Sequence, residues 1–281
     1  MFQLSGWDEV NGRNIMLDHV LISDRPAYTH RGISLDTVRN FISLDKIKQV
    51  GFNDRKTFEE LKIIFQVIDS LSYSKMNVFH WHISDSQSFP LQLPTLPDFS
   101  RFGAYTPESI YTEEDIKELV DYADDRGVRI IPELDAPAHV GAGWETVDPD
   151  YTVCRDADPW ETSCVQPPCG QLNPSKDGIY EVLQMIFKDM LTMFRPTSFH
   201  MGGDEIHVGC WNSTKMITDW LVEQGRGLNE DDFIWMWSQY QNKSYEKLVN
   251  ASKTAGLTNV PEVILWNSHL TNKEYINYLV G

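Results

Sequence analysis

The stretch Ser198-Phe-His-Met-Gly-Gly-Asp-Glu-Ile206 runs from apolar residues through two glycines into two adjacent carboxylates. Neighbouring residues in a regular strand point to opposite faces, so in mid-strand only one of Asp204 and Glu205 could face a given site. Gly202 and Gly203 tolerate the backbone angles of a strand that ends in a turn, and such a turn can direct both carboxylates into the same site. Two carboxylates in different environments can supply one proton donor and one permanent anion. The same pair could instead open a helix, where acids are favoured, so the remaining segments must decide between a site and a helix start.

Predicted strands alternate with predicted helices along the chain, which indicates a parallel sheet. The strands are expected at 31–36, 76–83, 128–134, 198–205 and 262–267. The helices are expected at 43–76, 112–126, 179–194, 213–224 and 230–255, and a further strand-like run covers 15–22. Thr112 has the sequence signature of a helix cap.

Four successive strands end in polar residues. The groups are Asp85, then Asp135 with His139, then Asp204 with Glu205, then Trp266 with Asn267. The carboxyl ends of the strands form the active-site face of a (β/α)8 barrel. A doubly wound sheet is the alternative, but the sequence contains no phosphate-binding glycine loop. We therefore predict an α/β protein with a (β/α)8 TIM barrel, of which only about the first five βα units are present.

The chain is strongly acidic. Its 281 residues include 24 basic and 41 acidic side chains, which gives a net charge of −17. Nucleic acids and anionic membranes attract clustered Lys and Arg, so neither is expected as a partner. No apolar run reaches the length of a membrane span, and Met1-Phe-Gln-Leu-Ser-Gly-Trp-Asp8 has no signal-peptide pattern.

Two features nonetheless indicate an export pathway. Three glycosylation sequons begin at Asn212, Asn242 and Asn250. The chain also has four cysteines, three of them within one loop: Cys154, Cys164, Cys169 and Cys210. A zinc site is the alternative to disulfides, but no Cys-x-x-Cys pair is present, so the pattern favours disulfides. An export pathway without an export signal suggests that the true N-terminus is missing from this chain.

Several side chains near the strand ends are candidate metal ligands: His80, His82, His139, His200, Asp204, Glu205 and His207. His80 and His82 share one strand face, an arrangement in which two imidazoles can hold zinc or nickel. Alternatively, either imidazole is a hydrogen-bonded group of the barrel wall. Arg31, which opens the first strand, could be a solvated strand end or a cation that binds substrate. Spacing alone favours the solvated end for Arg31 and does not decide the metal question.

Four motifs, in this order, resemble one known family. They are Arg31-Gly32, His80-Trp-His-Ile-Ser-Asp85, Asp135-Ala-Pro-Ala-His139 and His200-Met-Gly-Gly-Asp-Glu205. Together they resemble the glycoside hydrolase family 20 β-N-acetylhexosaminidases, and the resemblance extends from about Ser23 to the end. The loop from Cys164 to Asn173 is similar to that of the chitooligosaccharide-processing branch. The resemblance implies hydrolysis of terminal non-reducing β-linked GlcNAc or GalNAc from chitooligosaccharides or glycans, with a β-GlcNAc-terminated oligosaccharide as the substrate.

The family's mechanism assigns roles to four acid–base residues. The substrate's own 2-acetamido oxygen attacks the anomeric carbon, and the configuration is retained. By resemblance Glu205 is the general acid/base, and Asp204 holds the acetamido N–H and stabilises the oxazolinium intermediate. Asp85 and His139 form a relay that tunes the proton of Glu205. This chemistry needs no metal and no other cofactor, so the resemblance disfavours the metal interpretation.

The resemblance assigns roles to further residues. Arg31 and Asp135 bind substrate, and Trp266 helps to wall the acetamido pocket. The implied disulfides are Cys154–Cys210 and Cys164–Cys169. The full-length protein is expected to be secreted or lysosomal, and a homodimer of it is left open.

Two departures from the family affect these expectations. The sequence stops after the fifth strand, and residues 1–30 correspond only to the end of a preceding α/β N-terminal domain, so 31–281 is expected to be a partial catalytic barrel. Residues about 50–66 are extra, and their boundaries fit a short intron read in frame; they should bulge from the first helix or distort it. The alternative function is therefore a catalytically inactive truncated fragment or a sugar-binding remnant.

Overall fold

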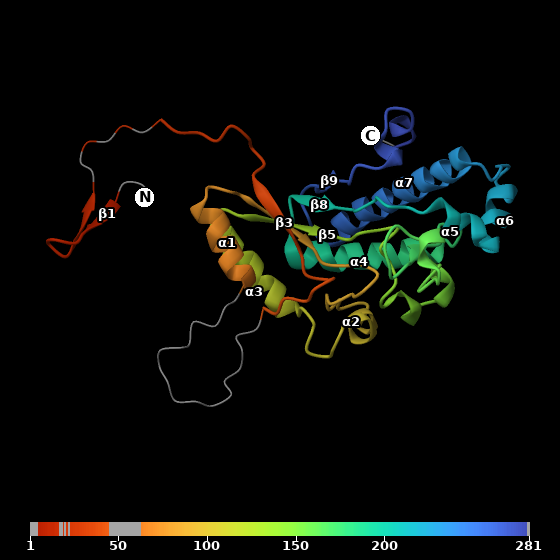
Figure 1. The fold of residues 1–281 in the computed structure, drawn as a ribbon, viewed down its shortest axis with the longest axis horizontal. Helices are drawn as coiled ribbons and strands as arrows, with labels where there is room; N and C mark the ends of the chain where they lie inside the picture. The colour runs from red at the N-terminus through yellow and green to blue at the C-terminus, as the bar shows by residue number, and fades with distance from the viewer. Residues whose placement is uncertain (1–4, 17–18, 20, 22, 45–62, 280–281) are drawn as a thin grey trace. The chain divides into compact units, whose positions relative to one another are not determined.

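The computed structural model describes residues 5–16, 19, 21, 23–44 and 63–279 (Figure 1). The chain divides into two compact units, Met1–His30 and Arg31–Gly281. In the first unit, β1 (Ser5–Asp8) and β2 (Arg13–Met16) form an antiparallel hairpin. Of the strand expected over 15–22, the structure therefore contains the first two residues, and positions 17, 18, 20 and 22 lie outside the described residues.

A five-stranded parallel sheet is the basis of the second unit. Its strands, in spatial order, are β3 (Gly32–Asp36), β4 (Val78–His82), β5 (Arg129–Glu133), β8 (Ser198–His200) and β9 (Glu262–Ile264). Each of the five predicted strands is present. The register pairs Asp36 with His82, His82 with Glu133, and Glu133 with His200. The carboxyl ends of the strands are therefore aligned along one edge of the sheet.

Helices connect the strands and pack beside one another (Figure 1). The long ones are α1 (Ile63–Tyr73), α3 (Glu113–Asp124), α4 (Gly178–Phe194) and α7 (Glu230–Thr254). Neighbours in this series contact each other, α1 with α3, α3 with α4 and α4 with α7. Capping boxes begin α3 at Thr112, as predicted, and α7 at Asn229. Among the described residues, no helix combines the length and the apolar character that a membrane span requires.

Shorter elements complete the second unit. The short helices are α2 (Pro97–Gly103), α5 (Val208–Ser213) and α6 (Lys215–Glu223). The long connection between β5 and α4 contains a two-stranded antiparallel ribbon, β6 (Thr152–Val153) and β7 (Gln171–Leu172). The single turns of 3-10 helix are η2 (Trp144–Thr146), η3 (Pro149–Tyr151), η4 (Trp160–Thr162), η5 (His269–Thr271) and η6 (Ile276–Tyr278).

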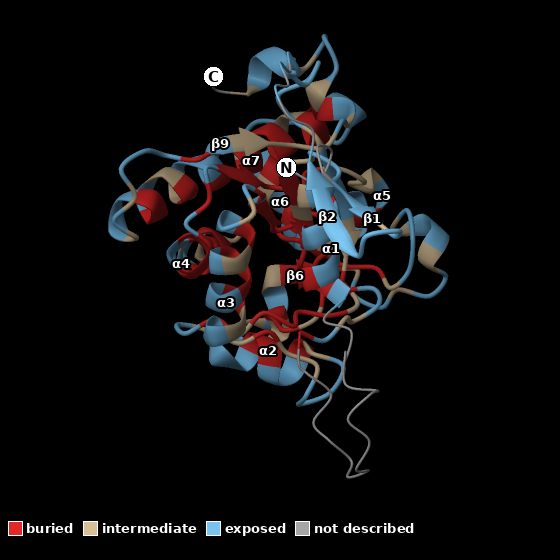
Figure 2. Ribbon diagram, turned by 90° about the vertical axis from the view of Figure 1, so that its left-hand side faces the viewer, coloured by how far each residue is buried: buried red, intermediate tan, exposed pale blue. Residues whose placement is uncertain are grey.

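Strand alternation separates the core from the site on β4. Phe79 and Trp81 are fully buried in the hydrophobic core, whereas His80 and His82 alternate with them and point to the opposite face. The Trp81 ring packs edge-on against Phe194 of α4, and burial of an aromatic side chain of this kind contributes about 1.5–3 kcal/mol. The central strands β4, β5 and β8 are mostly buried, whereas β3 and β9 are not, and Figure 2 shows the exposed residues on the outer faces of the helices. The apolar residues of the strand thus fix the imidazoles on the other side.

The first predicted helix, over 43–76, is shorter in the described part of the chain. Ser43 and Leu44 are not helical, and the described helix is α1. Residues 45–62, which include most of the extra stretch of about 50–66, lie outside the described residues. The end of that stretch is part of α1, where Ile64 and Phe65 are buried in the core.

Candidate active site

Asp204 and Glu205 follow β8 after a sharp change of backbone direction. Gly202 and Gly203 have φ values of 63° and 89°, and Glu205 itself has a φ of 52°. Left-handed backbone costs energy in residues other than glycine and is concentrated at functional sites. The next helix, α5, begins only at Val208, so the two acids lie in the turn rather than in its first helical turn. The structure thus contains the break that the glycine pair predicts.

His139 lies between Glu205 and Asp85. Its Nε2 is 3.0 Å from Glu205 Oε2, and its Nδ1 is 3.4 Å from Asp85 Oδ1. Asp85 and His139 are buried, whereas the Glu205 side chain is 35 % exposed. The structure therefore brings these three sequence-predicted residues into contact in the order of an acid–base relay.

The charges of this relay stabilise one another. Burial alone would lower the pKa of His139, but hydrogen bonds to Asp85 and Glu205 outweigh burial and raise that pKa to about 11. The hydrogen bond from His139 is the main cause that lowers the pKa of Glu205. Burial opposes ionisation of Asp85, yet its bonds to His139 and His82 hold its pKa well below the usual range. His139 is therefore a cation between two carboxylates.

Asp204 has a different environment from its neighbour. Its Oδ1 is buried and has no hydrogen-bond partner among the residues that the structure describes. Burial raises the pKa of Asp204, and the negative charge of Glu205 raises it further, although the charge of His139 opposes both. The two adjacent acids thus differ in protonation tendency, because Glu205 has an imidazolium partner, whereas Asp204 is more buried and its Oδ1 has no donor among the described residues.

Arg39 is a site residue that the sequence analysis missed. Its guanidinium lies 2.7 Å from Asp85 Oδ2 and 2.8 Å from Asp36 Oδ2. A signal was present, because Asp36 ends the first strand as the other polar groups end theirs, and Arg39 follows three residues later. Arg39 gives Asp85 a second kind of cationic partner beside the imidazoles.

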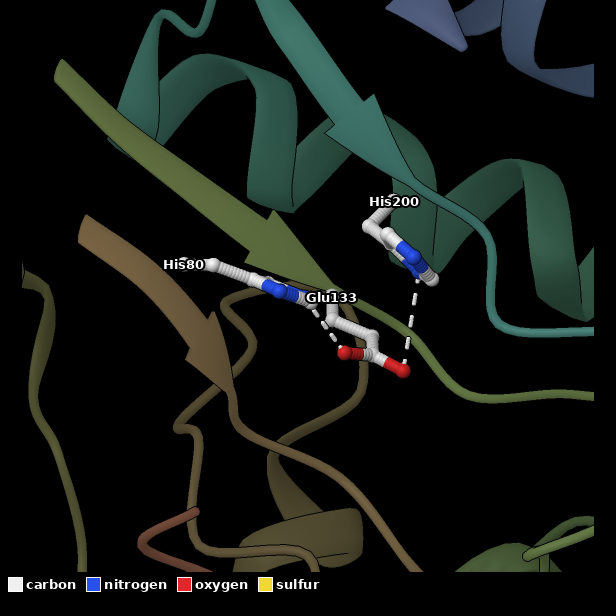
Figure 3. A group of neighbouring side chains, drawn as sticks. All are labelled: His80, Glu133 and His200. Atoms are coloured by element: carbon white, nitrogen blue, oxygen red, sulfur yellow. Dashed lines mark hydrogen bonds and ion pairs between the residues drawn. The ribbon is translucent and has the colours of Figure 1, made fainter. Parts of the chain in front are cut away.

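Glu133, the last residue of β5, was also missed. Its Oε2 lies 2.6 Å from His80 Nε2, and its Oε1 lies 3.3 Å from His82 Nδ1. Figure 3 shows His80, Glu133 and His200 converging from three adjacent strands. His82 Nε2 is also 3.0 Å from Asp85 Oδ2. The relay therefore continues as an alternating row of carboxylates and imidazoles: Glu133, His82, Asp85, His139 and Glu205.

Three groups of side chains in the described part of the chain could hold a metal ion. They are His80–Glu133–His200, His82–Asp85–Asp135 and Asp135–His139–Asp204. Many of these atoms already pair with one another, and His200 Nδ1 accepts the N–H of Gly202 at 3.1 Å. Burial lowers the pKa of His200 to about 4, so this ring is a neutral acceptor. The contacts favour hydrogen-bonded wall positions for His80 and His82, and the expectation that the chain needs no cofactor stays a prediction.

Trp266 and Asp135 lie around the acid pair, at different depths. Trp266 is half-buried, and its indole N–H donates to Glu133 Oε1 at 2.7 Å. Asp135 is only 3 % exposed, and burial raises its pKa well above the ordinary value. A supporting position beneath Gly202 suits Asp135 better than direct contact with a sugar.

The structure does not bring Arg31 to these residues. Arg31 precedes β3, at the amino end of the sheet, and its Nε donates to the Lys75 carbonyl at 2.8 Å. The five residues of β3 separate it from the carboxyl end, which is about 16 Å at 3.3 Å per residue. Its predicted contact with sugar hydroxyls therefore has no geometric support here.

Two disulfides hold the long β5–α4 connection at the site. Cys154 bonds to Cys210, and Cys164 bonds to Cys169, as the resemblance implies. The smaller ring carries Gln166, whose Nε2 donates to Glu205 Oε2 at 3.3 Å. Ring residues and Glu205 line a small cavity together with His139. The crosslinked loop thus contributes a hydrogen-bond donor to the proposed acid.

The three sequons differ in their surroundings. Asn212 and Asn250 are exposed on α5 and α7. Asn242 is half-buried in the middle of α7, where its Nδ2 donates to the Tyr278 carbonyl at 2.8 Å, and the hydroxyl residue of its sequon, Ser244, is fully buried. The surroundings of the first two suit glycosylation better than those of Asn242.

The fold and the site define an α/β protein with acid–base side chains at the carboxyl ends of a parallel sheet. The sequence model of glycosyl hydrolase family 20, catalytic domain, matches residues 54–279. The chain therefore belongs to this family, and the predicted resemblance is confirmed.

Individual relatives agree with this assignment. The chain is 42 % identical over 275 residues to a chitooligosaccharidolytic β-N-acetylglucosaminidase of Bombyx mori, and 42 % identical over 276 residues to that of Ostrinia furnacalis. Each alignment covers 98 % of this chain and 42 % of the relative, so the chain spans less than half the length of these proteins.

Solved structures of the family share the fold. A chitobiase of Flavobacterium johnsoniae matches with a TM-score of 0.68 and 25 % identity, over 94 % of this chain and 35 % of the other. A family 20 exo-β-N-acetylglucosaminidase of Vibrio harveyi matches with a TM-score of 0.71 and 21 % identity, over 97 % of this chain and 40 % of the other. At 21 % identity, the Vibrio harveyi match shows a similar fold and nothing further.

Proposed function

We propose that this chain supplies the acid–base residues of a β-N-acetylhexosaminidase, which removes terminal non-reducing β-linked N-acetylhexosamine from chitooligosaccharides or glycans. Family membership and the names of the relatives at 42 % identity support this chemistry. The observation that carries the proposal is the contact of His139 with Glu205, directly beside the unpartnered oxygen of Asp204. A proton donor and an acceptor for an amide N–H are thereby adjacent in the chain.

Glu205 is the proposed general acid/base. A bound sugar displaces water from this partly exposed carboxylate, and the loss of water raises its pKa. The proton in reach is the one on His139 Nε2 at 3.0 Å, and the ring that remains keeps its Nδ1–H toward Asp85. Protonated Glu205 gives its proton to the glycosidic oxygen as the C–O bond breaks, and it later takes a proton from the attacking water.

Asp204 is the proposed partner of the substrate's acetamido group. An N–H donor at its buried oxygen offsets the cost of burial and favours the carboxylate. The carboxylate then orients the acetamido oxygen for attack on the anomeric carbon and stabilises the positive charge of the oxazolinium intermediate. Water opens this intermediate from the face that the aglycone left, so the configuration is retained.

The five-stranded sheet, on this proposal, corresponds to the first five βα units of a TIM barrel, and residues 1–30 to the end of a preceding domain. The parallel strand order and the family 20 structural matches support the correspondence. Two disulfides support an oxidising compartment, secreted or lysosomal. The proposed partner is a β-GlcNAc-terminated oligosaccharide.

Release of p-nitrophenol from its β-GlcNAc conjugate by the purified 281-residue chain tests the proposal. We expect hydrolysis of this conjugate, and no hydrolysis of the β-glucoside, which lacks the acetamido group. Glu205→Gln should lower kcat by about 10²–10⁴-fold, the usual contribution of a general acid. Glu262→Gln is the matched control, because Glu262 is exposed at the amino end of β9.

Two outcomes would contradict the proposal in different ways. Equal rates for the parent chain and Glu205→Gln would remove Glu205 from the acid–base role. A well-folded parent chain that hydrolyses nothing but binds GlcNAc in a titration would be the sugar-binding remnant, and one that does neither would be an inactive fragment.

A further inference from the structure

Glu133 is a fully buried carboxylate outside the roles proposed above. It ends β5 in the centre of the five-stranded sheet and is 0 % exposed. A charge taken out of water costs several kcal/mol unless partners compensate for it. The partners that can donate to it come from β4 and from the segment after β9: His80, His82 and Trp266. The neutral His200 ring lies beside the carboxylate, with its Nδ1 3.6 Å from Oε1. Such a concentration of contacts on one carboxylate points to a task beyond packing.

The two carboxylate oxygens have different partners. Oε2 lies 2.6 Å from His80 Nε2. Oε1 accepts the indole N–H of Trp266 at 2.7 Å and lies 3.3 Å from His82 Nδ1. One oxygen atom therefore fixes two rings, one on the proposed pocket wall and one at the far end of the alternating row.

Trp266 is held by its ring and by its backbone as well as by this bond. Its ring packs against the imidazoles of His200 and His80, at centroid distances of 4.6 and 5.4 Å. Its backbone N–H donates to the Gly202 carbonyl at 3.0 Å, two residues before Asp204. The backbone bond holds the residue beside the acid turn, and the bond to Glu133 is the contact made by the indole N–H.

We propose that Glu133 is a positioning residue for the proposed reaction, in which a single oxygen fixes both the Trp266 wall and the His82 end of the proton-carrying row. The inference rests on the proposed function, because that function gives Trp266 and the row their roles. Contact of the sugar with the Trp266 indole and proton transfer from His139 are then coupled through the Glu133 carboxylate.

The charge of Glu133 also acts on the row. Burial opposes protonation of His82, but its hydrogen bonds to Asp85 and then Glu133 raise its pKa to about 10. Loss of the Glu133 charge should release this proton at lower pH. Asp85 then loses one cationic neighbour and holds the proton of His139 more tightly, so transfer to Glu205 becomes harder.

Other titratable and charged groups face these residues and stay in place. Those beside Glu133 and His82 are His80, His200, Asp85 and Asp135, and those beside Asp85 are Arg39 and His139. None of them replaces Glu133 as the acceptor of the Trp266 indole N–H.

The test uses Glu133→Gln and Trp266→Phe, with Glu262→Gln as the matched control. In 1H–15N spectra, the Trp266 indole resonance is the one that Trp266→Phe removes. We expect Glu133→Gln to move this resonance and to lower the pH at which the His82 ring loses its proton. Trp266→Phe should leave the His82 titration as in the parent chain, and Glu262→Gln should change neither signal.

The same variants are then assayed on p-nitrophenyl β-GlcNAc across pH. We expect Trp266→Phe to raise KM by about tenfold with little change in the pH profile, since only the wall is affected. Glu133→Gln should raise KM similarly and also lower kcat, with the loss growing above the new pKa of His82. A variant that only loses stability would not change the pH dependence of kcat. Thermal unfolding of each protein measures the change in stability separately.

Unchanged indole and His82 signals in folded Glu133→Gln would overturn the inference, as would kinetics equal to those of Glu262→Gln in an active chain. If Glu133→Gln does not fold, the shorter carboxylate of Glu133→Asp serves instead: it keeps the charge but should release the indole, and an unmoved indole signal there overturns the inference too. A parent chain without hydrolysis would refute the proposed function, while the two spectroscopic signals would still decide whether Glu133 positions both rings.

Discussion

Gly202 and Gly203 form a matched pair that tests how the turn before the acids is built. Both have left-handed φ values, so alanine at either position costs about 1–2 kcal/mol of backbone strain. Their surroundings differ. A Cβ at Gly202 would lie 2.0 Å from Asp135 Oδ1 and 2.6 Å from Asp135 Cα, whereas a Cβ at Gly203 would meet its nearest atoms, on Gln241 and Leu265, at 3.5 Å.

The expected costs follow from this difference. The clash at Gly202 includes a backbone atom, which a side-chain rotation cannot move away, so an overpacking cost of about 1–3 kcal/mol adds to the strain. We expect Gly202→Ala to lower the free energy of unfolding by about 2–5 kcal/mol. Gly203→Ala has ordinary contacts and should cost only the strain, about 1–2 kcal/mol.

Urea unfolding of the parent chain and of both variants, followed by tryptophan fluorescence, measures these values. The slope of the transition should be the same for all three proteins, so that a shift in midpoint reports stability. Equal losses of unfolding free energy in the two variants would refute the close approach of Gly202 to Asp135. A larger loss for Gly203→Ala than for Gly202→Ala would refute it as well.

Two further perturbations follow from the crosslinks and from the relay. In the chain-entropy view, the Cys154–Cys210 bond, which spans 56 residues, stabilises the fold by about 4 kcal/mol, whereas Cys164–Cys169, which spans 5, contributes about 2 kcal/mol. Urea unfolding of the double Ser variant of each pair should therefore show the larger loss of stability for Cys154–Cys210. The opposite order would contradict the chain-entropy estimate. His139→Gln removes a ring whose pKa is raised from 6.5 to about 11, so the stability it contributes is fully present below pH 6.5 and declines as pH rises toward 11. The difference in unfolding free energy between the parent chain and His139→Gln should therefore be smaller at pH 9 than at pH 6, and a difference that stays constant would contradict the ion-paired state.

The sequence predicts those parts of the site that depend on position along a strand. Asp85, His139, Asp204 and Glu205 all follow strand ends, and parallel strands bring such ends to one edge of the sheet. Glycine next to the acids signals the left-handed turn, because few other residues adopt it. Local chain geometry is sufficient for inferences of this kind.

The missed residues depend on side-chain direction and on partners far away in the chain. Glu133 lies inside a predicted apolar strand, and only the contact with Trp266, 133 residues later, makes it a shared acceptor. Arg31 illustrates the converse: its motif predicts the site, but it precedes its strand and contacts the opposite end of the sheet. A motif identifies which residues occur together, whereas reach and direction must come from the fold.

The adjacent acids show why the fold decides chemistry that sequence order leaves open. Asp204 and Glu205 share a backbone turn, yet His139 favours the ionised form of Glu205, and burial favours the neutral form of Asp204. The proposed reaction needs the reverse, a protonated Glu205 and an ionised Asp204. A substrate can cause both changes at once, because its sugar ring removes water from Glu205 while its amide N–H occupies the vacant acceptor of Asp204. An analogue with the sugar ring but no amide N–H should therefore favour protonation of Glu205 without favouring ionisation of Asp204. For that reason we expect such an analogue to bind without being hydrolysed.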